Sequence, residues 1–319
     1  EVILLDINAL HQSLKETSSE LLFGNIKFYL IKERNNNDGV ILCNLEIERN
    51  AQEDLLSIFN VFFQNTRTRS REQLEYDVVM DHTGKKSFLT TSINEYTGIK
   101  SFIQMFQDDN PADTIKDVST DKFIGYAVEV TIPNGLNFIF VGEFSKLSKI
   151  SRMKLVGNLQ NNKFRKLDTH DTFGFSKNIA MVVYNDEVLI NHITLFEKCC
   201  QMETEFKKKS AAVLKEIEGY GFIDNIEELI KTSERDSRIA RRLTKMNSDP
   251  QRVEAFFTNK HKVREVLTDP EFKDKFEGIE YNGKVLKYDS KLRQQFITLI
   301  SDAAYKSIVG GQKRIDNSL

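Results

Sequence analysis

The sequence predicts an α+β fold, in which an N-terminal part of sheet and helix is followed by an antiparallel sheet and then by a helical region. Two observations support this prediction. Alternating or β-branched apolar segments are frequent before residue 190, whereas apolar residues at helical spacing dominate after residue 194. Strands and helices are therefore segregated along the chain, without the regular alternation that is typical of a doubly wound sheet.

The change from sheet to helix lies within residues 178–197, NIAMVVYNDEVLINHITLFE. Its two apolar runs, around Val182 and Leu189, have the β-branched character of buried strands. Asn185 and Asp186 lie between these runs and are typical turn residues. The segment is predicted to form two paired core strands that lead directly into a helix.

Residues 1–115 are predicted to form an N-terminal domain of sheet and helix. The expected elements are an amphipathic helix at 7–21, a hairpin of strands at 25–32 and 40–47, a helix at 51–65, a strand within the basic segment 66–80, and a helix at 98–106. Acidic and turn residues at 108–111 interrupt the helical spacing, so the domain boundary is placed within residues 107–121.

Residues 116–319 form the second predicted domain, with a sheet at 120–190 and helices at 194–319. Strands are expected at 123–132 and 136–144, joined by a Pro-Asn-Gly turn at 133–135, and at 154–159 and 164–167. A late hairpin is expected to turn at Asn282 and Gly283. The predicted helices are 194–218, 225–233, 234–247, 251–267 and 290–308.

The composition is that of a globular protein, with 40% hydrophobic residues. No apolar run approaches the roughly 20 residues that a membrane-spanning helix requires, so we expect no direct membrane insertion. No basic leader precedes an apolar stretch at the start of the sequence, and a cytoplasmic location is the expectation. Cys43, Cys199 and Cys200 lack the spacing of a disulfide framework or a zinc site, so reduced thiols are expected.

The sequence contains no familiar catalytic motif. The Walker loop, the dinucleotide fingerprint, the nucleophile elbow and HExxH are absent, and the five histidines lie far apart. No catalytic residue, metal ligand or cofactor is therefore predicted. A metal-dependent nuclease could be built from Asp186, Glu205 and Lys207. However, positions 205 and 207 lie in a predicted helix, where side chains two residues apart diverge.

Charge is unevenly distributed along the chain. Residues 1–115 carry 11 basic and 18 acidic groups, whereas residues 116–319 carry 34 basic and 29 acidic groups. The excess is greatest within residues 144–215, where 13 Lys and Arg accompany 7 Asp and Glu. A local basic excess of this kind attracts phosphate groups. The alternative interpretation is an ordinary solvated surface.

Three groups of basic residues are the candidate DNA contacts. The first extends across the short predicted strands, the second lies in the helix at 194–218, and the third lies in the helix at 234–247. In the third group, with Arg235 and Lys245 at its ends, the spacing predicts one broad helix face. Such cations neutralise backbone phosphates without reading bases. The candidates are Lys146, Lys149, Arg152, Lys154, Lys163, Arg165, Lys166, Lys207, Lys208, Lys209, Arg238, Arg241 and Arg242.

Four segments within residues 140–319 resemble the KwaB family, the soluble component of the Kiwa anti-phage defence system. They are FVGEFSKLSKISRMKLVG, FRKLDTHDTFGFSKNIAMVVYNDEVLINHITLFEKCC, IARRLTKM and LRQQFITLISDAAYKSIV. The most specific part is the strand, turn and VLINHITLFE sequence with the helix that follows. Residues 1–115 carry less of the resemblance.

The resemblance implies a cytoplasmic antiviral protein that binds DNA without strong sequence preference. It also implies a transmembrane partner, KwaA, which senses phage attack and recruits the protein to the inner membrane. Occupation of the DNA would interfere with phage replication or transcription, and a homodimer or higher homo-oligomer is expected. The resemblance supplies no catalytic residue. A metal-dependent nuclease and an adaptor that contacts only proteins are the alternative hypotheses.

Overall fold

The computed structural model divides into two compact units, Glu1–Tyr76 with Lys86–Gln201 and Asp77–Lys85 with Met202–Leu319. Sheet dominates the first unit and helices dominate the second, which confirms the α+β prediction. The helix predicted at 7–21 and the turn predicted at 133–135 lie outside the described residues. The structure describes residues 26–34, 39–68, 73–80, 88–107, 122–131, 137–146, 157–160, 163–166, 173–306 and 313–315.

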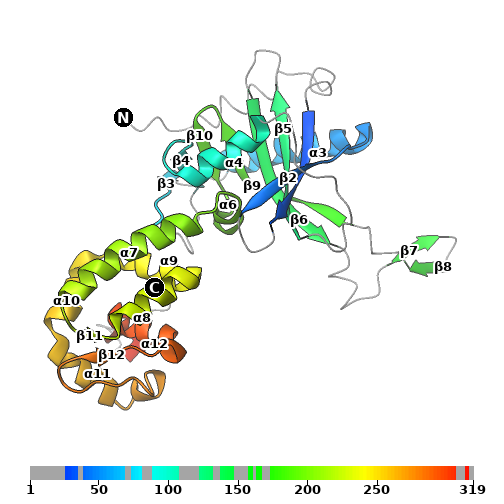
Figure 1. Ribbon diagram of the computed structural model, residues 1–319. Helices are drawn as coiled ribbons and strands as arrows, with labels where there is room; N and C mark the ends of the chain where they lie inside the picture. The colour runs from blue at the N-terminus through cyan, green and yellow to red at the C-terminus, as the bar shows by residue number, and fades with distance from the viewer. Residues whose placement is uncertain are drawn as a thin grey trace. The chain divides into compact units, whose positions relative to one another are not determined.

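An eight-stranded sheet forms the centre of the first unit, in the order β2-β1-β5-β6-β9-β10-β4-β3 (Figure 1). Neighbouring strands are antiparallel, as predicted, except for the parallel pair of β3 and β4 at one edge. A separate two-stranded sheet consists of β7 (Gly157–Gln160) and β8 (Lys163–Lys166). The strands of the large sheet are β1 (Ile26–Glu33), β2 (Val40–Asn44), β3 (Gln73–Glu75), β4 (Phe88–Ser92), β5 (Phe123–Thr131), β6 (Asn137–Lys146), β9 (Phe173–Tyr184) and β10 (Glu187–Ile190).

Helices cover both faces of this sheet. The helix α3 (Arg49–Thr68) packs on one face, where Phe59 stacks on Phe140 of β6 with ring centroids 4.0 Å apart. The helix α4 (Thr97–Gln107) packs on the other face, where Phe106 contacts Tyr29 of β1 edge-on at 5.3 Å. The helices predicted at 51–65 and 98–106 are confirmed. Burial of aromatic residues on both faces stabilises the sheet.

The segment that joins sheet to helix in the sequence has the predicted structure. Val182 of β9 pairs with Leu189 of β10, and both side chains are buried. Asn185 in the turn between these strands has a left-handed φ of 51°, which asparagine tolerates better than most residues. The helix α6 (Ile193–Cys199) then begins three residues after β10.

The single helix predicted at 194–218 is wrong. The helix α6 ends at Cys199, and α7 (Glu203–Gly219) begins four residues later. Gln201 lies between them with φ 51°, a left-handed conformation that interrupts an α-helix. The backbone is also crowded here, because a Cβ atom on Gly98 would lie 1.8 Å from the carbonyl oxygen of Cys200. Glycine at position 98 permits this close approach.

The division into units differs from the boundary predicted at 107–121. Strands β1 to β4 precede that segment and β5, β6, β9 and β10 follow it, yet all eight share one sheet. The pairing of β1 with β5 joins the two sides directly. The predicted boundary therefore falls within one unit. The second unit consists of Met202–Leu319 together with the short segment Asp77–Lys85.

The second unit is mainly helical, and its helices share an apolar core that includes Leu229, Leu243 and Phe296. The helices predicted at 225–233 and 234–247 are confirmed. The helix predicted at 251–267 is divided, because a short 3-10 helix, η2 (Lys260–Lys262), separates two α-helices. The α-helices after α7 are α8 (Ile226–Arg235), α9 (Ser237–Met246), α10 (Pro250–Thr258), α11 (Val263–Thr268) and α12 (Arg293–Ile300).

The predicted turn at Asn282 and Gly283 is present, but the expected hairpin is reduced to one bridge between Tyr281 and Leu286. Instead, β12 (Leu286–Lys287) pairs in parallel with β11 (Ile223–Asp224). The side chain of Asn282 accepts hydrogen bonds from the two backbone N–H groups that follow Gly283, each at 2.9 Å. Local turn chemistry was therefore predicted correctly, and the strand partner was not.

The helix predicted at 290–308 is shorter than expected. A 3-10 helix, η4 (Ser290–Leu292), leads into α12, and Asp302 then has a left-handed φ of 50°. Arg252 of α10 donates from Nε and Nη2 to the carbonyl oxygen of Asp302, at 3.2 and 2.7 Å. The chain continues as β13 (Ala304–Lys306), which pairs with β14 (Lys313–Ile315).

Candidate nucleic-acid interface

Three predicted DNA contacts lie on β8 of the two-stranded ribbon. Asn158 pairs with Arg165, and Gln160 pairs with Lys163. Paired residues share a face of an antiparallel ribbon, and alternate residues of one strand do the same. These four positions therefore share one face, while Lys166 lies on the other.

The other candidates of the first group are placed only in part. Lys146 is the last residue of β6, where it pairs with Phe173 of β9. Lys149, Arg152 and Lys154 lie outside the described residues. Their part in the interface therefore stays a prediction from the sequence.

The three lysines near the start of α7 differ in their surroundings. Lys207 forms an ion pair with Glu203, one turn earlier, at an N–O distance of 2.8 Å. Lys208 and Lys209 are exposed. Phe206, at the start of the same helix, is buried. The apolar side of α7 therefore packs on the core, and Lys208 and Lys209 are exposed to solvent.

The five cations predicted on one helix face do not share one helix. Arg235 ends α8, and Asp236 is extended, with φ −115° and ψ 100°, before α9 begins at Ser237. The carboxylate of Asp236 accepts the backbone N–H of Arg238 at 3.1 Å, which is an N-cap hydrogen bond. The prediction is wrong for Arg235, because helical spacing continues in the sequence while a capping residue starts a new helix. The other four cations lie in α9.

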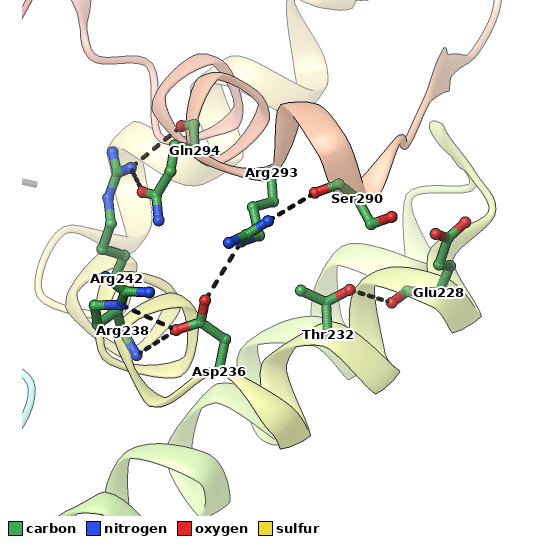
Figure 2. Close-up of polar contacts among 8 residues, drawn as sticks. All are labelled: Glu228, Thr232, Asp236, Arg238, Arg242, Ser290, Arg293 and Gln294. Carbon is green, nitrogen blue, oxygen red and sulfur yellow. Dashed lines mark hydrogen bonds and ion pairs between the residues drawn. The ribbon is translucent and has the colours of Figure 1, made fainter.

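Asp236 also contacts two guanidinium groups (Figure 2). Nε of Arg238 lies 3.4 Å from one carboxylate oxygen, and Nε of Arg293 lies 3.3 Å from the other. Burial raises the pKa of Asp236, but the backbone hydrogen bond, charge and side-chain hydrogen bond of Arg238 outweigh it and hold the pKa below its ordinary value. Arg293 also donates to the carbonyl oxygen of Ser290 at 3.2 Å. These contacts connect the junction of α8 and α9 to the start of α12.

Arg242 connects α9 to α12 a second time (Figure 2). Its Nη1 donates to the backbone carbonyl and the side-chain Oε1 of Gln294, at 3.2 and 2.8 Å. Its Nη2 donates to Oγ1 of Thr298 at 2.8 Å. The side chain is half-buried, and this burial lowers the pKa of Arg242. The guanidinium therefore acts as a clamp within the unit.

The remaining cations of α9 also differ in exposure. The side chain of Arg238 is 79% exposed, although Asp236 holds it on one side. Arg241 lies over the ring of Phe206 at 5.3 Å, and Lys245 is buried. Of the three predicted contacts on α9, Arg238 has the most accessible charge.

Neither a metal site nor a reactive thiol is found in the part of the chain that the structure describes. No group of three or more His, Cys, Asp and Glu side chains there could hold a metal ion. Asp186 lies in the turn between β9 and β10, where its carbonyl oxygen accepts the N–H of Ile93 at 2.9 Å. Cys199 and Cys200 are buried, and burial raises the pKa of Cys199 to about 12, so this thiol stays protonated at neutral pH.

One basic group was not predicted from the sequence. Lys260 and Lys262 of η2, Arg264 of α11 and Lys284 beside Gly283 are all exposed. The run KHKVR at residues 260–264 is the available sequence signal. This run lies within the segment predicted as one continuous helix at 251–267. Lys284 is distant in the sequence, and only the fold brings its segment near this run.

The fold and these surfaces define an α+β protein with exposed basic groups. Among the helices that the structure describes, none is long and apolar enough to cross a membrane. A family model described as Kiwa protein KwaB-like matches residues 120–310, which is more than half of the 319 residues. The chain therefore belongs to the Kiwa protein KwaB-like family, and this family is part of the Kiwa anti-phage defence system. No curated protein and no solved structure matches the chain.

Proposed function

We propose that this protein is an antiviral effector that binds DNA with little sequence specificity. In this proposal it is a cytoplasmic homo-oligomer, which the transmembrane partner KwaA recruits to the inner membrane. Occupation of the DNA blocks phage replication or transcription, so no covalent chemistry is needed. Membership of the KwaB-like family supports the antiviral role. The 13 basic against 7 acidic residues within 144–215 support a polyanionic ligand.

The observation that carries DNA binding is the register of the ribbon of β7 and β8. Lys163 and Arg165 share one face with Asn158 and Gln160. The major groove of B-DNA is wide enough for a two-stranded ribbon, and all four residue types donate hydrogen bonds. Lysine and arginine on such a ribbon also contact phosphates, which gives affinity without sequence information.

The helix α7 supplies a second group of cations to the proposed interface. Lys208 and Lys209 are exposed, whereas Lys207 is already paired with Glu203. A lysine that already has a carboxylate partner gains less free energy when it contacts a phosphate. We therefore expect Lys207 to contribute less to DNA affinity than Lys208 and Lys209. Arg242 is left out because Gln294 and Thr298 bind its guanidinium.

The test is DNA affinity as a function of salt, measured by fluorescence anisotropy on a duplex of about 30 base pairs between about 50 and 200 mM NaCl. We expect the logarithm of the binding constant to fall linearly with the logarithm of the salt concentration. The combined changes Lys163→Glu, Arg165→Glu and Lys166→Glu should weaken binding at every concentration. They should also reduce the slope by about 2 to 3 units, because each phosphate contact contributes about 0.9.

A control variant carries the same charge change at scattered exposed positions, with Lys231, Lys273 and Lys291 changed to Glu. It should retain most of the affinity. Equal loss in both variants would assign binding to net charge rather than to the ribbon. Absence of any salt-dependent binding by the unmodified protein would contradict the proposal and favour the protein-only adaptor.

The nuclease hypothesis has a direct test in the same preparation. The protein is incubated with supercoiled plasmid and Mg²⁺ or Mn²⁺, and the products are separated on a gel. The proposal predicts intact plasmid. Cleavage that disappears in Asp186→Ala would replace the binding proposal with a metal-dependent nuclease.

A further inference from the structure

The unpredicted basic group is a surface of its own, which we call the turn patch and define as Lys260, Lys262, Arg264 and Lys284. All four side chains are exposed and belong to the second unit. Two separate segments contribute to it, namely η2 with the start of α11 and the turn at Gly283. No single helix or strand contains the patch, so its existence depends on the fold.

An aromatic pair holds the two segments together. The ammonium group of Lys260 lies 5.7 Å from the ring centroid of Phe222, which is fully buried. The ring of Tyr281 packs edge-on against Phe222 at 5.8 Å, and its hydroxyl donates to the backbone carbonyl of Lys260 at 3.3 Å. Lys260 is therefore fixed beside the turn at both its backbone and its side chain.

Arg264 is fixed beside the same turn. A Cβ atom at Gly283 would lie 3.1 Å from Nη2 of Arg264, so the guanidinium lies against this glycine. Gly283 also has a left-handed φ of 91°, and Asn282 accepts the backbone N–H of Lys284 at 2.9 Å. A turn with one defined conformation thus places Lys284 next to Arg264.

No described carboxylate forms an ion pair with a cation of the turn patch. In residues 259–265 and 281–285 the only carboxylate is Glu265. The nearby Glu280 is already paired with Lys287 at 3.0 Å. Within the described part of the chain, the four patch cations form no ion pair. The two segments therefore offer an external anion four exposed cations without an ion-pair partner among the described residues.

The chemistry of the patch favours phosphate over a protein surface. Protein interfaces depend on apolar or aromatic anchors that become buried at their centre. The exposed large hydrophobic residues of the described chain are Val61 and Met80, and neither belongs to the segments of the patch. Several cations without an apolar centre are what a phosphate backbone requires.

We propose that the turn patch is a further contact surface for the phosphate backbone of double-stranded DNA. This inference rests on the proposed DNA binding, and it assigns part of the affinity to the helical unit rather than to the ribbon alone. The guanidinium of Arg264 supplies paired donors for one phosphate, and the lysines supply point charges for its neighbours.

The experiment compares two neutralised variants on the same duplex over the same salt range. The patch variant combines Lys262→Gln, Arg264→Gln and Lys284→Gln, and retains Lys260 because that side chain packs on Phe222. The control combines Lys231→Gln, Lys273→Gln and Lys291→Gln at exposed positions elsewhere in the unit. We expect the salt slope of the patch variant to fall by about 2 to 3 units and that of the control to stay close to the original. Thermal unfolding of both variants checks that they are folded.

The outcomes separate this inference from the proposed function. If the unmodified protein binds DNA and both variants have the same salt slope, the proposal that the turn patch contacts DNA is wrong, while the proposed DNA binding remains supported. If the patch variant alone loses slope, the inference is supported, whatever the ribbon variant shows. If the unmodified protein binds no DNA at about 50 mM NaCl, the proposed function and the turn patch fail together.

Discussion

The arginines of α9 and the cations of the turn patch belong to the same unit, but they use their charge in different ways. Arg242 donates three hydrogen bonds to Gln294 and Thr298, and Arg238 contacts the carboxylate of Asp236. In the turn patch, Arg264 and Lys284 are exposed and form no ion pair with any described residue. Basic residues at regular helical spacing can therefore be occupied by hydrogen bonds within the unit, as in α9. The less regular cations of the turn patch are the ones that can bind an external anion.

The difference comes from what surrounds each cation. The start of α9 carries its own carboxylate, Asp236, and α12 presents carbonyl, amide and hydroxyl oxygens to Arg242. The turn patch is built on a backbone turn and an aromatic pair, neither of which offers an anionic oxygen. A count of Lys and Arg in the sequence finds both the arginines of α9 and the cations of the turn patch. Only the hydrogen bonds and ion pairs in the structure distinguish the two groups.

The largest expected effect is on the clamp. Arg242→Ala removes three hydrogen bonds that a charged donor makes to Gln294 and Thr298. We expect the free energy of unfolding to fall by about 2 to 3 kcal/mol, measured by urea titration. The affinity of the folded variant for DNA should not change, because Gln294 and Thr298 already bind the guanidinium.

Arg238→Ala is the matched control for this prediction. Its side chain is mostly exposed, and surface ion pairs contribute about 0 to 1 kcal/mol. A loss of stability for Arg238→Ala as large as that for Arg242→Ala would remove the distinction between clamp and surface. A loss of DNA affinity for Arg242→Ala alone would restore this residue to the interface.

The next effect in size concerns Asp236, which caps α9 and contacts Arg238 and Arg293. Asp236→Ala should lower the free energy of unfolding by about 1 to 2 kcal/mol at pH 7, as lost N-caps do. Asp236→Asn should cost less, because asparagine is also a good N-cap and only the charge is lost. Circular dichroism during urea unfolding measures both variants.

The same residue gives a pH dependence with a defined sign. The pKa of Asp236 is held below its ordinary value, since hydrogen bonds and the charge of Arg238 outweigh burial. The stabilisation is therefore complete above the pKa of the unfolded chain and is lost as the pH falls through the lower pKa of the folded state. The difference in stability between the original protein and Asp236→Asn should shrink from pH 7 to about pH 3. A constant difference would contradict the ionic contribution.

Gly283→Ala tests the support of the turn patch. Gly283 has a φ of 91°, and a Cβ atom there would crowd Arg264 at 3.1 Å. We expect a loss of about 1 kcal/mol or more in the free energy of unfolding, together with weaker DNA binding. Gly219→Ala is the control, because a Cβ atom at this last residue of α7 meets nothing within 4 Å. It should leave DNA binding unchanged and raise stability slightly.

The sequence predicted the sheet core well for a physical reason. The runs around Val182 and Leu189 are β-branched and apolar on both faces, and the sheet buries both faces under helices. The strand β4 was missed because two of its four buried residues, Thr90 and Thr91, carry little hydrophobic signal. The break at Gln201 was missed because its cause is tertiary, in part the close approach of the backbone to Gly98.

The candidate site was less predictable. The positions of Lys163 and Arg165 on one face follow from strand alternation, so local periodicity was sufficient there. Arg235 does not belong to the predicted face, because Asp236 lies inside an apparently continuous helical pattern and starts a new helix. The turn patch joins distant segments through Phe222 and Tyr281, and no local pattern in a single sequence contains that contact.

The smallest expected effect separates two adjacent lysines of α7. Lys207 pairs with Glu203 in the favourable orientation, with the acid one turn before the base, and such pairs contribute about 0.3 to 0.5 kcal/mol. Lys208 is exposed and forms no ion pair with any described residue. Lys207→Ala should therefore lower the free energy of unfolding by that small amount, and Lys208→Ala should leave it nearly unchanged.

The order of the two lysine variants should reverse when DNA affinity is measured instead of stability. No described carboxylate pairs with Lys208, so Lys208→Ala should weaken binding more than Lys207→Ala, with a larger reduction of the salt slope. Glu203→Gln supplies the check, because it releases Lys207 and should strengthen binding slightly while lowering stability. If the two lysine variants instead change stability and affinity in the same order, then pairing within the chain does not decide which cations are available to DNA. The difference between cations that have partners within the chain and cations that do not would then apply only to α9 and the turn patch.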